Sequence, residues 1–468
     1  MAATAAVFLL LKITGLTFRF SDGNIYLYMA KAIGEGFWPY RDFVLVDPPF
    51  LVFLLTALRA LIRDHFLAYQ VIPAVLEAGS SILLYVLLRL RGNKLSFLAP
   101  LLYLFSFTVL ATSDYLTGVQ LAVFLMLMAI FLYEKNKSIW SGVLWALAAL
   151  TKLYVAPAIL GFLIYNIWRK EFAKLGRIIT GGALTTVVFL GPFLFTAPTQ
   201  VYKYLWVMHF NRPAGLDKWN VWGFFVSHEW FLLATAAAGI YFCFKKTKLH
   251  RDAPIGKSAT GEYLLWLFIP LLAFFLVYKD VYYLYLDSLL PYLLIFSFIF
   301  LNWLYEKDIR ARMALAVVAV MGFSSLTGFI FNYYQVTRAD GQFPNALEVA
   351  AYVKTLPPEF DLYGGQEMVS LVALLSGRKL FNNYIDTNAQ IFATNTLDLE
   401  QVSNEAADKG VYLIGRLADH PELGIQNYGS EGYFAKDVFE KYCKEIKDFP
   451  NGNQELLNKI VIFKCSKN

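Results

Sequence analysis

Long apolar runs dominate the first two thirds of the chain. A helix that crosses a bilayer needs roughly 20 mostly apolar residues, and runs near this length recur up to residue 331. We therefore predict about eleven transmembrane helices, near residues 2–18, 69–88, 95–111, 117–133, 139–151, 153–168, 178–195, 229–244, 262–278, 283–302 and 313–331.

The pattern changes after residue 331, where short helical and strand patterns alternate. Helices are predicted near 346–354, 368–375 and 435–446, and strands at 361–364, 410–414 and 459–463. Alternation of this kind is typical of a small α/β layer domain. The sequence thus predicts a polytopic α-helical membrane domain over residues 1–331 and a soluble C-terminal α/β domain, the tail, over residues 332–468.

Composition and charge agree with this division. The chain of 468 residues is 58% hydrophobic and only 16% charged, which excludes a water-soluble protein. Residues 1–331 carry 28 basic and 17 acidic side chains, whereas the tail carries 13 and 18. The basic excess is typical of cytoplasmic loops, and the tail has no basic patch interleaved with aromatic residues, so nucleic acid is excluded as a partner.

The loops between the predicted spans separate into two sets by charge. One alternate set of short loops holds 17 Lys and Arg residues, including the loop from Lys245 to Lys257, and the longer opposite set holds ten. The positive-inside rule places the first set in the cytoplasm. With an odd number of spans, we predict a multi-pass protein of the cell (plasma) membrane with a cytoplasmic N-terminus and an extracytoplasmic tail.

The chain has three cysteines, too few for a disulfide scaffold. Cys243 lies in an apolar run, where a cysteine packs as a small hydrophobic residue. Cys443 and Cys465 lie in the polar tail. They either pair in an oxidising compartment or remain as two buried thiols.

The two longest outer loops hold the candidate chemistry. The first, of about 50 residues, contains Asp22, Asp42 and Asp47. A short amphipathic helix on the membrane surface is predicted from Asp22 to a stop at Gly34, and a second from Asp47 to Leu61. Asp22 and Asp47 are either helix caps or carboxylates that act as a general base on a sugar hydroxyl.

Further charged residues are predicted on the same side of the membrane. Asp114 emerges there, as a solvated loop residue or as a third candidate acid. The cations on this side that suit a phosphate at headgroup level are Lys152, Lys203, His209, Arg212 and Lys279. The alternative for each lysine is a snorkelling anchor near a helix end.

Several of these segments resemble one known family. Asp22 before a helix, the run Gly36-Phe37-Trp38-Pro39-Tyr40-Arg41-Asp42, and Pro48-Pro49 resemble the first outer loop of the C-type glycosyltransferase (GT-C) superfamily. The resemblance is greatest to glycosyltransferase family 39, the dolichyl-phosphate-mannose protein mannosyltransferase-like proteins. The segment Gly142–Lys152 is similar to the helix-to-turn signature "GLA-x-LTK", and Lys279, Tyr285 and Pro291 follow the pattern of a second family helix.

The resemblance covers most of the membrane domain and implies an inverting transferase. The donor would be a sugar, hexosyl or mannosyl, on a polyprenyl phosphate, the acceptor an extracytoplasmic protein, glycan or lipid, and Asp22 the base. Two positions depart from the family pattern, because an acidic pair is reduced to Asp22-Gly23 and Asp47 replaces the His or Lys before Pro-Pro. The first leaves one candidate base, and the second removes a familiar phosphate or acceptor contact.

No metal or other cofactor is predicted. A divalent metal assists some relatives of the family, but no His/Asp cluster with ligand spacing is visible. In the tail, Asp386-Thr387-Asn388 resembles a "D-x-N" element of similar tails, or is simply a turn. The alternative functions are a lipid-linked-glycan transporter and a non-catalytic membrane scaffold. A transporter would need charges strung through the bilayer, where the sequence places only Lys12 and Glu77.

Overall fold

The computed structural model describes residues 2–249, 262–307, 309–335, 341–420, 425–429, 432–450 and 457–467. The chain divides into two compact units. Unit 1 comprises Met1–Leu16, Gln70–Phe189 and Ala214–Asp340, and unit 2 comprises Thr17–Tyr69, Leu190–Pro213 and Gly341–Asn468.

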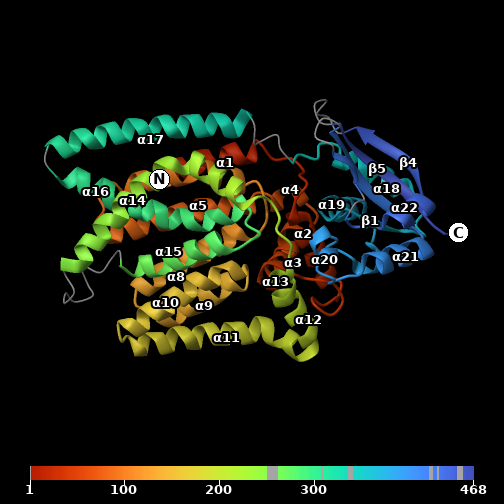
Figure 1. The fold of residues 1–468 in the computed structure, drawn as a ribbon, viewed down its shortest axis with the longest axis horizontal. Helices are drawn as coiled ribbons and strands as arrows, with labels where there is room; N and C mark the ends of the chain where they lie inside the picture. Colours follow the sequence, from red (N-terminus) through yellow and green to blue (C-terminus); the bar gives the residue numbers. More distant parts are fainter. Residues whose placement is uncertain are drawn as a thin grey trace. The chain divides into compact units, whose positions relative to one another are not determined.

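Unit 1 is built from apolar helices, and all eleven predicted spans fall on helices of the structure (Figure 1). They are α1 (Ala2–Ile13), α5 (Ile72–Leu90), α6 (Ala99–Leu104) with α7 (Phe107–Thr112), α8 (Val119–Glu134), α9 (Ser138–Ala149), α10 (Ala156–Trp168), α11 (Phe172–Thr196), α14 (Lys218–Leu249), α15 (Glu262–Val277), α16 (Leu290–Glu306) and α17 (Ile309–Gln335). Five helical stretches among the described residues are long and apolar enough to cross a membrane, namely Phe66–Leu90, Phe172–Thr196, Lys218–Phe244, Tyr283–Glu306 and Arg312–Tyr334. The chain is therefore a multi-pass membrane protein.

One predicted span of unit 1 is broken in the structure, and one predicted loop lies partly outside the described residues. The span at 95–111 is not one helix, because Ser106 leaves the helical conformation and its Oγ accepts a hydrogen bond from the Val109 amide, starting α7 anew. The predicted cytoplasmic loop at Lys245–Lys257 lies outside the described residues beyond Leu249. The helices pack in pairs, such as α14 with α16 and α10 with α15.

The deep lysine of the first helix is neutralised within unit 1. Lys12 is 6% exposed, and its Nζ lies 3.0 Å from Asp114 Oδ1 and 2.6 Å from the Tyr333 hydroxyl. A buried charge is tolerated only when it is paired and hydrogen-bonded. This contact explains why a cation and an acid occur at those positions of the sequence.

Unit 1 buries further ionisable side chains besides Lys12 and Glu77. Glu229 of α14 and Asp287, ahead of α16, are each at most 1% exposed. Glu77 accepts a 2.7 Å hydrogen bond from Tyr103. Glu229 lies at a break inside α14 and Asp287 in the 3-10 turn before α16, so packing of the helices buries acids that the apolar pattern does not reveal. How many ionisable side chains lie deep in the bilayer stays a prediction.

The tail forms the predicted α/β structure. Its five strands are β1 (Asp361–Gly364), β2 (Val411–His420), β3 (Ile425–Gly429), β4 (Cys443–Pro450) and β5 (Leu457–Cys465). The order is β1-β2-β5-β4, with β3 beside β2; β1 is parallel to β2 and the other pairs are antiparallel. Its longer helices are α18 (Ala346–Thr355), α19 (Gln366–Ser376), α21 (Leu399–Lys409) and α22 (Lys436–Tyr442).

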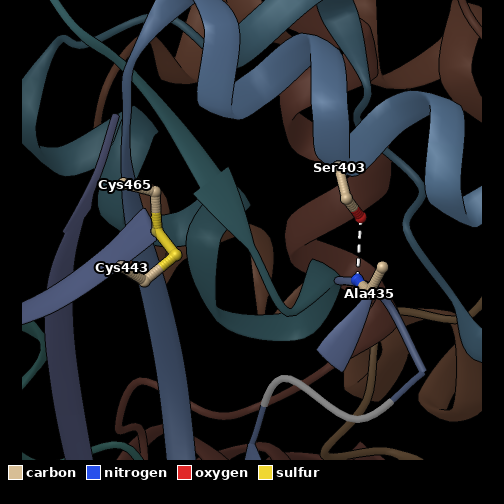
Figure 2. The surroundings of a disulfide bond; sticks show 4 residues. All are labelled: Ser403, Ala435, Cys443 and Cys465. Atoms are coloured by element: carbon tan, nitrogen blue, oxygen red, sulfur yellow. Dashed lines mark hydrogen bonds between the residues drawn. A yellow bond between two sulfur atoms is a disulfide. The ribbon is translucent and has the colours of Figure 1, made fainter. Parts of the chain in front are cut away.

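One boundary in the tail was predicted wrongly. The helix expected over 435–446 ends at Tyr442, and the chain continues as β4 from Cys443. The cause is the partner strand, because Cys443 lies opposite Cys465 of β5 and forms a disulfide with it. Figure 2 shows this bond together with a second tie, the 2.8 Å hydrogen bond from the Ala435 amide to Ser403 Oγ of α21. Of the two alternatives for the tail cysteines, pairing is the one observed.

The first outer loop folds with the tail in unit 2. It forms α2 (Asp22–Gly34), α3 (Phe50–Ile62) and α4 (Phe66–Tyr69), and the second outer loop forms α12 (Pro198–Tyr202), a π-helical turn (Lys203–Val207) and α13 (Met208–Asn211). The helix at Asp22 is confirmed and ends before Gly36, whose φ of +95° favours glycine. It does not lie on a membrane surface, since both its faces are covered by protein: Figure 1 shows it beside α19 of the tail, and it also contacts α3.

Unit 2 therefore combines segments from both predicted domains. A compact unit can combine segments that are far apart in the sequence. The predicted boundary between the membrane domain (residues 1–331) and the tail (residues 332–468) therefore stays a prediction.

Candidate functional site

Asp22 lies at the first turn of α2 but is not its cap. The N-cap is Ser21, whose backbone is extended (φ −160°, ψ 146°) and whose Oγ accepts a 3.1 Å hydrogen bond from the Gly23 amide. The Asp22 side chain is exposed at the positive end of the helix dipole. Ser21, not Asp22, is therefore the cap of α2, and the Asp22 carboxylate lies in the first turn of the helix.

Asp47 does not cap a helix either. The second helix starts three residues later than predicted, with Pro49 as its N-cap and no side-chain hydrogen bond there. The Asp47 carboxylate accepts a hydrogen bond from Tyr26 of α2, and its carbonyl accepts one from the Tyr40 hydroxyl at 2.9 Å. Asp47 is thus held against α2, the helix that begins at Asp22.

A third carboxyl in the same part of unit 2 belongs to the tail. Asp386 precedes α20 (Ala389–Ala393) in a turn where the Asn388 amide donates to Asp386 Oδ1 at 3.3 Å and Asn388 Oδ1 caps α20. The expected turn is present, but the acid in it is only 8% exposed. Burial and then the negative charge of Asp22 raise the pKa of Asp386 to about 7, with Asp47 adding to the rise and Arg212 opposing it.

Glu367 of α19 adds a fourth acid near Asp22. The crowding of protein around it and the charge of Asp22 raise its pKa to about 7, while Arg416 of β2 opposes the shift. Its side chain nevertheless remains exposed to solvent, which screens these charges. Of these two acids of the tail, Asp386 is the one whose side chain is buried.

The predicted cations of the second outer loop form hydrogen bonds with the tail and with the first outer loop. Arg212 donates from Nε to Gln390 of α20, and Lys203 donates to the Thr396 carbonyl at 3.2 Å. His209 Nε2 lies 2.8 Å from the Val46 carbonyl, next to Asp47. Two of these three side chains thus contact the tail and one contacts the first outer loop.

Apolar contacts fix these segments in place. Val44, Met208 and Ile391 form a small buried cluster that joins the first outer loop, the second outer loop and α20. Phe193 packs against the rings of Tyr40 and Phe53 at 5.2 and 5.9 Å between centroids. The charged groups therefore stand on a packed support, which a binding site requires.

The remaining candidates have other contacts or belong to unit 1. The Asp42 carboxylate pairs with Arg41 at 2.7 Å and accepts a hydrogen bond from the Trp38 amide. Both contacts lie within the first outer loop. Asp114, Lys152 and Lys279 belong to unit 1, where Asp114 pairs with Lys12, Lys152 is buried at the end of α9, and Lys279 is exposed. Unit 2 thus brings together Asp22, Asp47, Lys203, His209 and Arg212.

Sequence reasoning missed two members of the site, Glu367 and Gln390. The signal for Asp386 was present in the "D-x-N" element, but a turn residue in the tail gives no indication of its neighbours in space. In the described part of the chain, no group of three or more His, Cys, Asp or Glu side chains could hold a metal ion.

No protein-family model matches the chain, and no curated protein matches its sequence. Solved structures do match its fold. ArnT from Cupriavidus metallidurans, a GT-C glycosyltransferase, aligns with a TM-score of 0.58 in a crystal structure bound to undecaprenyl phosphate, at 12% identity and over 98% of this chain and 97% of that one. The apo crystal structure of ArnT aligns with the same TM-score at 11% identity, over 99% and 97%. The predicted GT-C fold is confirmed, and the assignment to family 39 stays a prediction.

Proposed function

We propose that this chain, which has the GT-C fold, is an inverting glycosyltransferase that moves a sugar from a polyprenyl phosphate to an acceptor outside the cytoplasm. The observation that carries the proposal is the charge arrangement of unit 2. Asp22 begins α2, Asp47 accepts a hydrogen bond from Tyr26 of the same helix, and Arg212 is hydrogen-bonded to Gln390, four residues after the buried Asp386. A base and a phosphate-binding cation are the two groups that such a transfer requires.

Asp22 is the proposed general base. Its carboxylate takes the proton from the acceptor hydroxyl while that oxygen attacks the anomeric carbon of the donor sugar. The bond from this carbon to the lipid phosphate breaks on the opposite face, and the electron pair leaves with the phosphate, so the configuration inverts. The exposed position of Asp22 at the start of α2 suits access by an acceptor.

Arg212 is the proposed partner of the leaving phosphate. A guanidinium binds phosphate oxygens in bidentate fashion and keeps its charge at every relevant pH. Lys203 and His209 lie in the same segment, and Lys152 and Lys279 of unit 1 remain further candidates for phosphate binding. No metal is needed in this scheme, because the cations neutralise the charge that develops on the phosphate.

The lipid carrier and the orientation belong to the same proposal. ArnT in the matching structure is bound to undecaprenyl phosphate, which favours a polyprenyl phosphate here. A hexose such as mannose is the proposed sugar, and the acceptor is a protein, glycan or lipid. The charge asymmetry of the loops supports a cytoplasmic N-terminus and an extracytoplasmic tail.

The rival functions are a lipid-linked-glycan transporter and a scaffold that keeps the fold without chemistry. A substitution that removes the proposed base distinguishes both from a transferase. Asp22→Asn preserves size and hydrogen bonding but cannot accept a proton, so it stops a transferase and leaves a transporter or scaffold working.

Mass spectrometry of a deletion strain identifies the two substrates. The donor is the lipid-linked sugar that accumulates in this strain, and the acceptor is the molecule that lacks that sugar. The full-length protein in lipid nanodiscs is then given that donor, and release of free polyprenyl phosphate is measured. We expect Asp22→Asn to lose roughly a hundredfold or more in turnover. The matched control is Asp64→Asn, an exposed acid of unit 2 that pairs with Arg59. Unchanged turnover in Asp22→Asn would remove Asp22 as the base, and absence of any turnover in the wild type would refute the transferase.

A further inference from the structure

Two residues of the tail approach the cation proposed to bind the donor. Gln390, in the first turn of α20, accepts the hydrogen bond from Arg212 Nε. Asp386, four residues earlier, lies within electrostatic range of the same guanidinium. Both belong to one short segment, whereas Arg212 comes from the second outer loop.

This tail segment is held on several sides. Thr387 Oγ donates to the Gly364 carbonyl at the end of β1 over 2.7 Å, which ties the turn to the sheet. Ile391 is fully buried against Val44 and Met208. A side chain on such a segment can fix the plane of a guanidinium, because its own position is already determined by packing.

The charges around Asp386 conflict when it is ionised. The charged groups that act on it are Asp22 at the start of α2 and Asp47 ahead of α3, which disfavour its ionised form, and Arg212 after α13. The Arg212 guanidinium is hydrogen-bonded to Gln390, four residues further along the same segment. An ionised Asp386 would add a negative charge near Asp22 and Asp47, in a buried position where charges interact more strongly than in water. In its neutral form, Asp386 adds no negative charge that competes with a phosphate for Arg212.

We propose that Gln390 and Asp386 are positioning residues that prepare Arg212 for the phosphate of the lipid-linked donor. Gln390 orients the guanidinium, and the proton on Asp386 keeps the positive potential at Arg212 high enough for a polyprenyl phosphate. This inference rests on the proposed function and extends it, since it assigns the tail a direct part in donor binding.

The inference predicts that donor binding depends on pH in a definite direction. Burial and the charge of Asp22 raise the pKa of Asp386 to about 7, so the proton is present below that pH and lost above it. Affinity for an anionic lipid should therefore fall as pH rises through about 7. The second ionisation of the phosphate, near pH 6, acts in the opposite direction and must be measured separately.

The test measures binding of undecaprenyl phosphate to the full-length protein in nanodiscs at pH 6 and pH 8.5. The Asp386→Asn variant cannot ionise at this position and keeps a carbonyl oxygen that accepts a hydrogen bond from the Asn388 amide. The pH dependence of its affinity therefore measures the contribution of the phosphate ionisation. We expect the affinity of the wild type to fall about tenfold more than that of Asp386→Asn over this range, which corresponds to a coupling of about one pKa unit. Asp64→Asn should behave as the wild type.

A second variant tests the other residue independently. Gln390→Ala should weaken binding of undecaprenyl phosphate about tenfold at both pH values, because the guanidinium loses its orienting partner. Its control is Gln401→Ala, which removes an exposed glutamine that donates to Glu405. Turnover at saturating donor should change less than donor affinity in both site variants.

The outcomes separate the inference from the proposed function. If the wild type binds no undecaprenyl phosphate, the proposed donor class fails and the inference falls with it. If the wild type binds but Asp386→Asn shows the same pH dependence, or Gln390→Ala binds as Gln401→Ala does, the positioning role alone is overturned.

Discussion

The disulfide between Cys443 and Cys465 links the stability of the tail to the side of the membrane on which it lies. Its two cysteines are opposite one another on β4 and β5 and are 22 residues apart in sequence. Closing a loop of this length in the unfolded chain removes roughly 11 cal/mol/K of conformational entropy, or about 3 kcal/mol at 25 °C. Replacing both cysteines with serine should therefore lower the free energy of unfolding of the tail by about 3 kcal/mol.

Hydrogen exchange on the full-length protein in nanodiscs measures this change locally. The amides of Ile460, Val461 and Ile462 lie in the centre of β5, on buried residues between two strands, and exchange when the sheet opens. A loss of about 3 kcal/mol corresponds to roughly a hundredfold faster exchange at these amides. Cys243→Ala, a change in α14 of unit 1, is the matched control and should leave this exchange unchanged.

Two results would refute the reasoning. If mass spectrometry finds both thiols free in protein purified without reductant, the bond does not form in the cell, and the extracytoplasmic placement of the tail rests on the loop charges alone. If the bond is present but the double serine variant exchanges at the wild-type rate, closure of this loop contributes nothing to stability.

Three further predictions concern the base, the buried acid and the topology. Asp22→Asn should lose far more turnover than Asp47→Asn, measured as release of polyprenyl phosphate; the reverse order would exchange their roles. The pKa of Asp386 is raised from 3.8 to about 7 in the folded state, so between these pH values the folded protein binds a proton that the unfolded chain has released. The free energy of unfolding therefore falls as pH rises from about 4 to 7. Asp386→Asn should therefore gain up to about 4 kcal/mol relative to wild type between pH 4 and 8, measured by hydrogen exchange of the tail, and no gain would contradict the buried charge. A cysteine engineered in the predicted cytoplasmic loop Lys245–Lys257 should react with an impermeant maleimide only after the cells are opened, and labelling in intact cells would reverse the predicted orientation.

The elements of the fold could be predicted because they depend on local pattern. Apolar runs must become helices in a bilayer, since each backbone polar group needs an internal partner there. The helix at Asp22 was also predictable from local signals, with Ser21 before it and Gly36 after it. The same local rules failed at Tyr442, where the helical pattern continues but the pairing of Cys443 with β5 ends the helix.

The site depended on contacts that no local pattern contains. Asp22, Arg212 and Asp386 are separated by well over a hundred residues, and their proximity arises from the packing of Val44, Met208 and Ile391 in one cluster. The sequence by itself determined which residue types were available on the outer loops, and it could not exclude that Asp22 and Asp47 were helix caps. The structure decided this point, because Ser21 and Pro49 occupy the cap positions. Only the tertiary structure could place the buried Asp386 of the tail near Arg212, because that arrangement depends on the packing of segments far apart in the sequence.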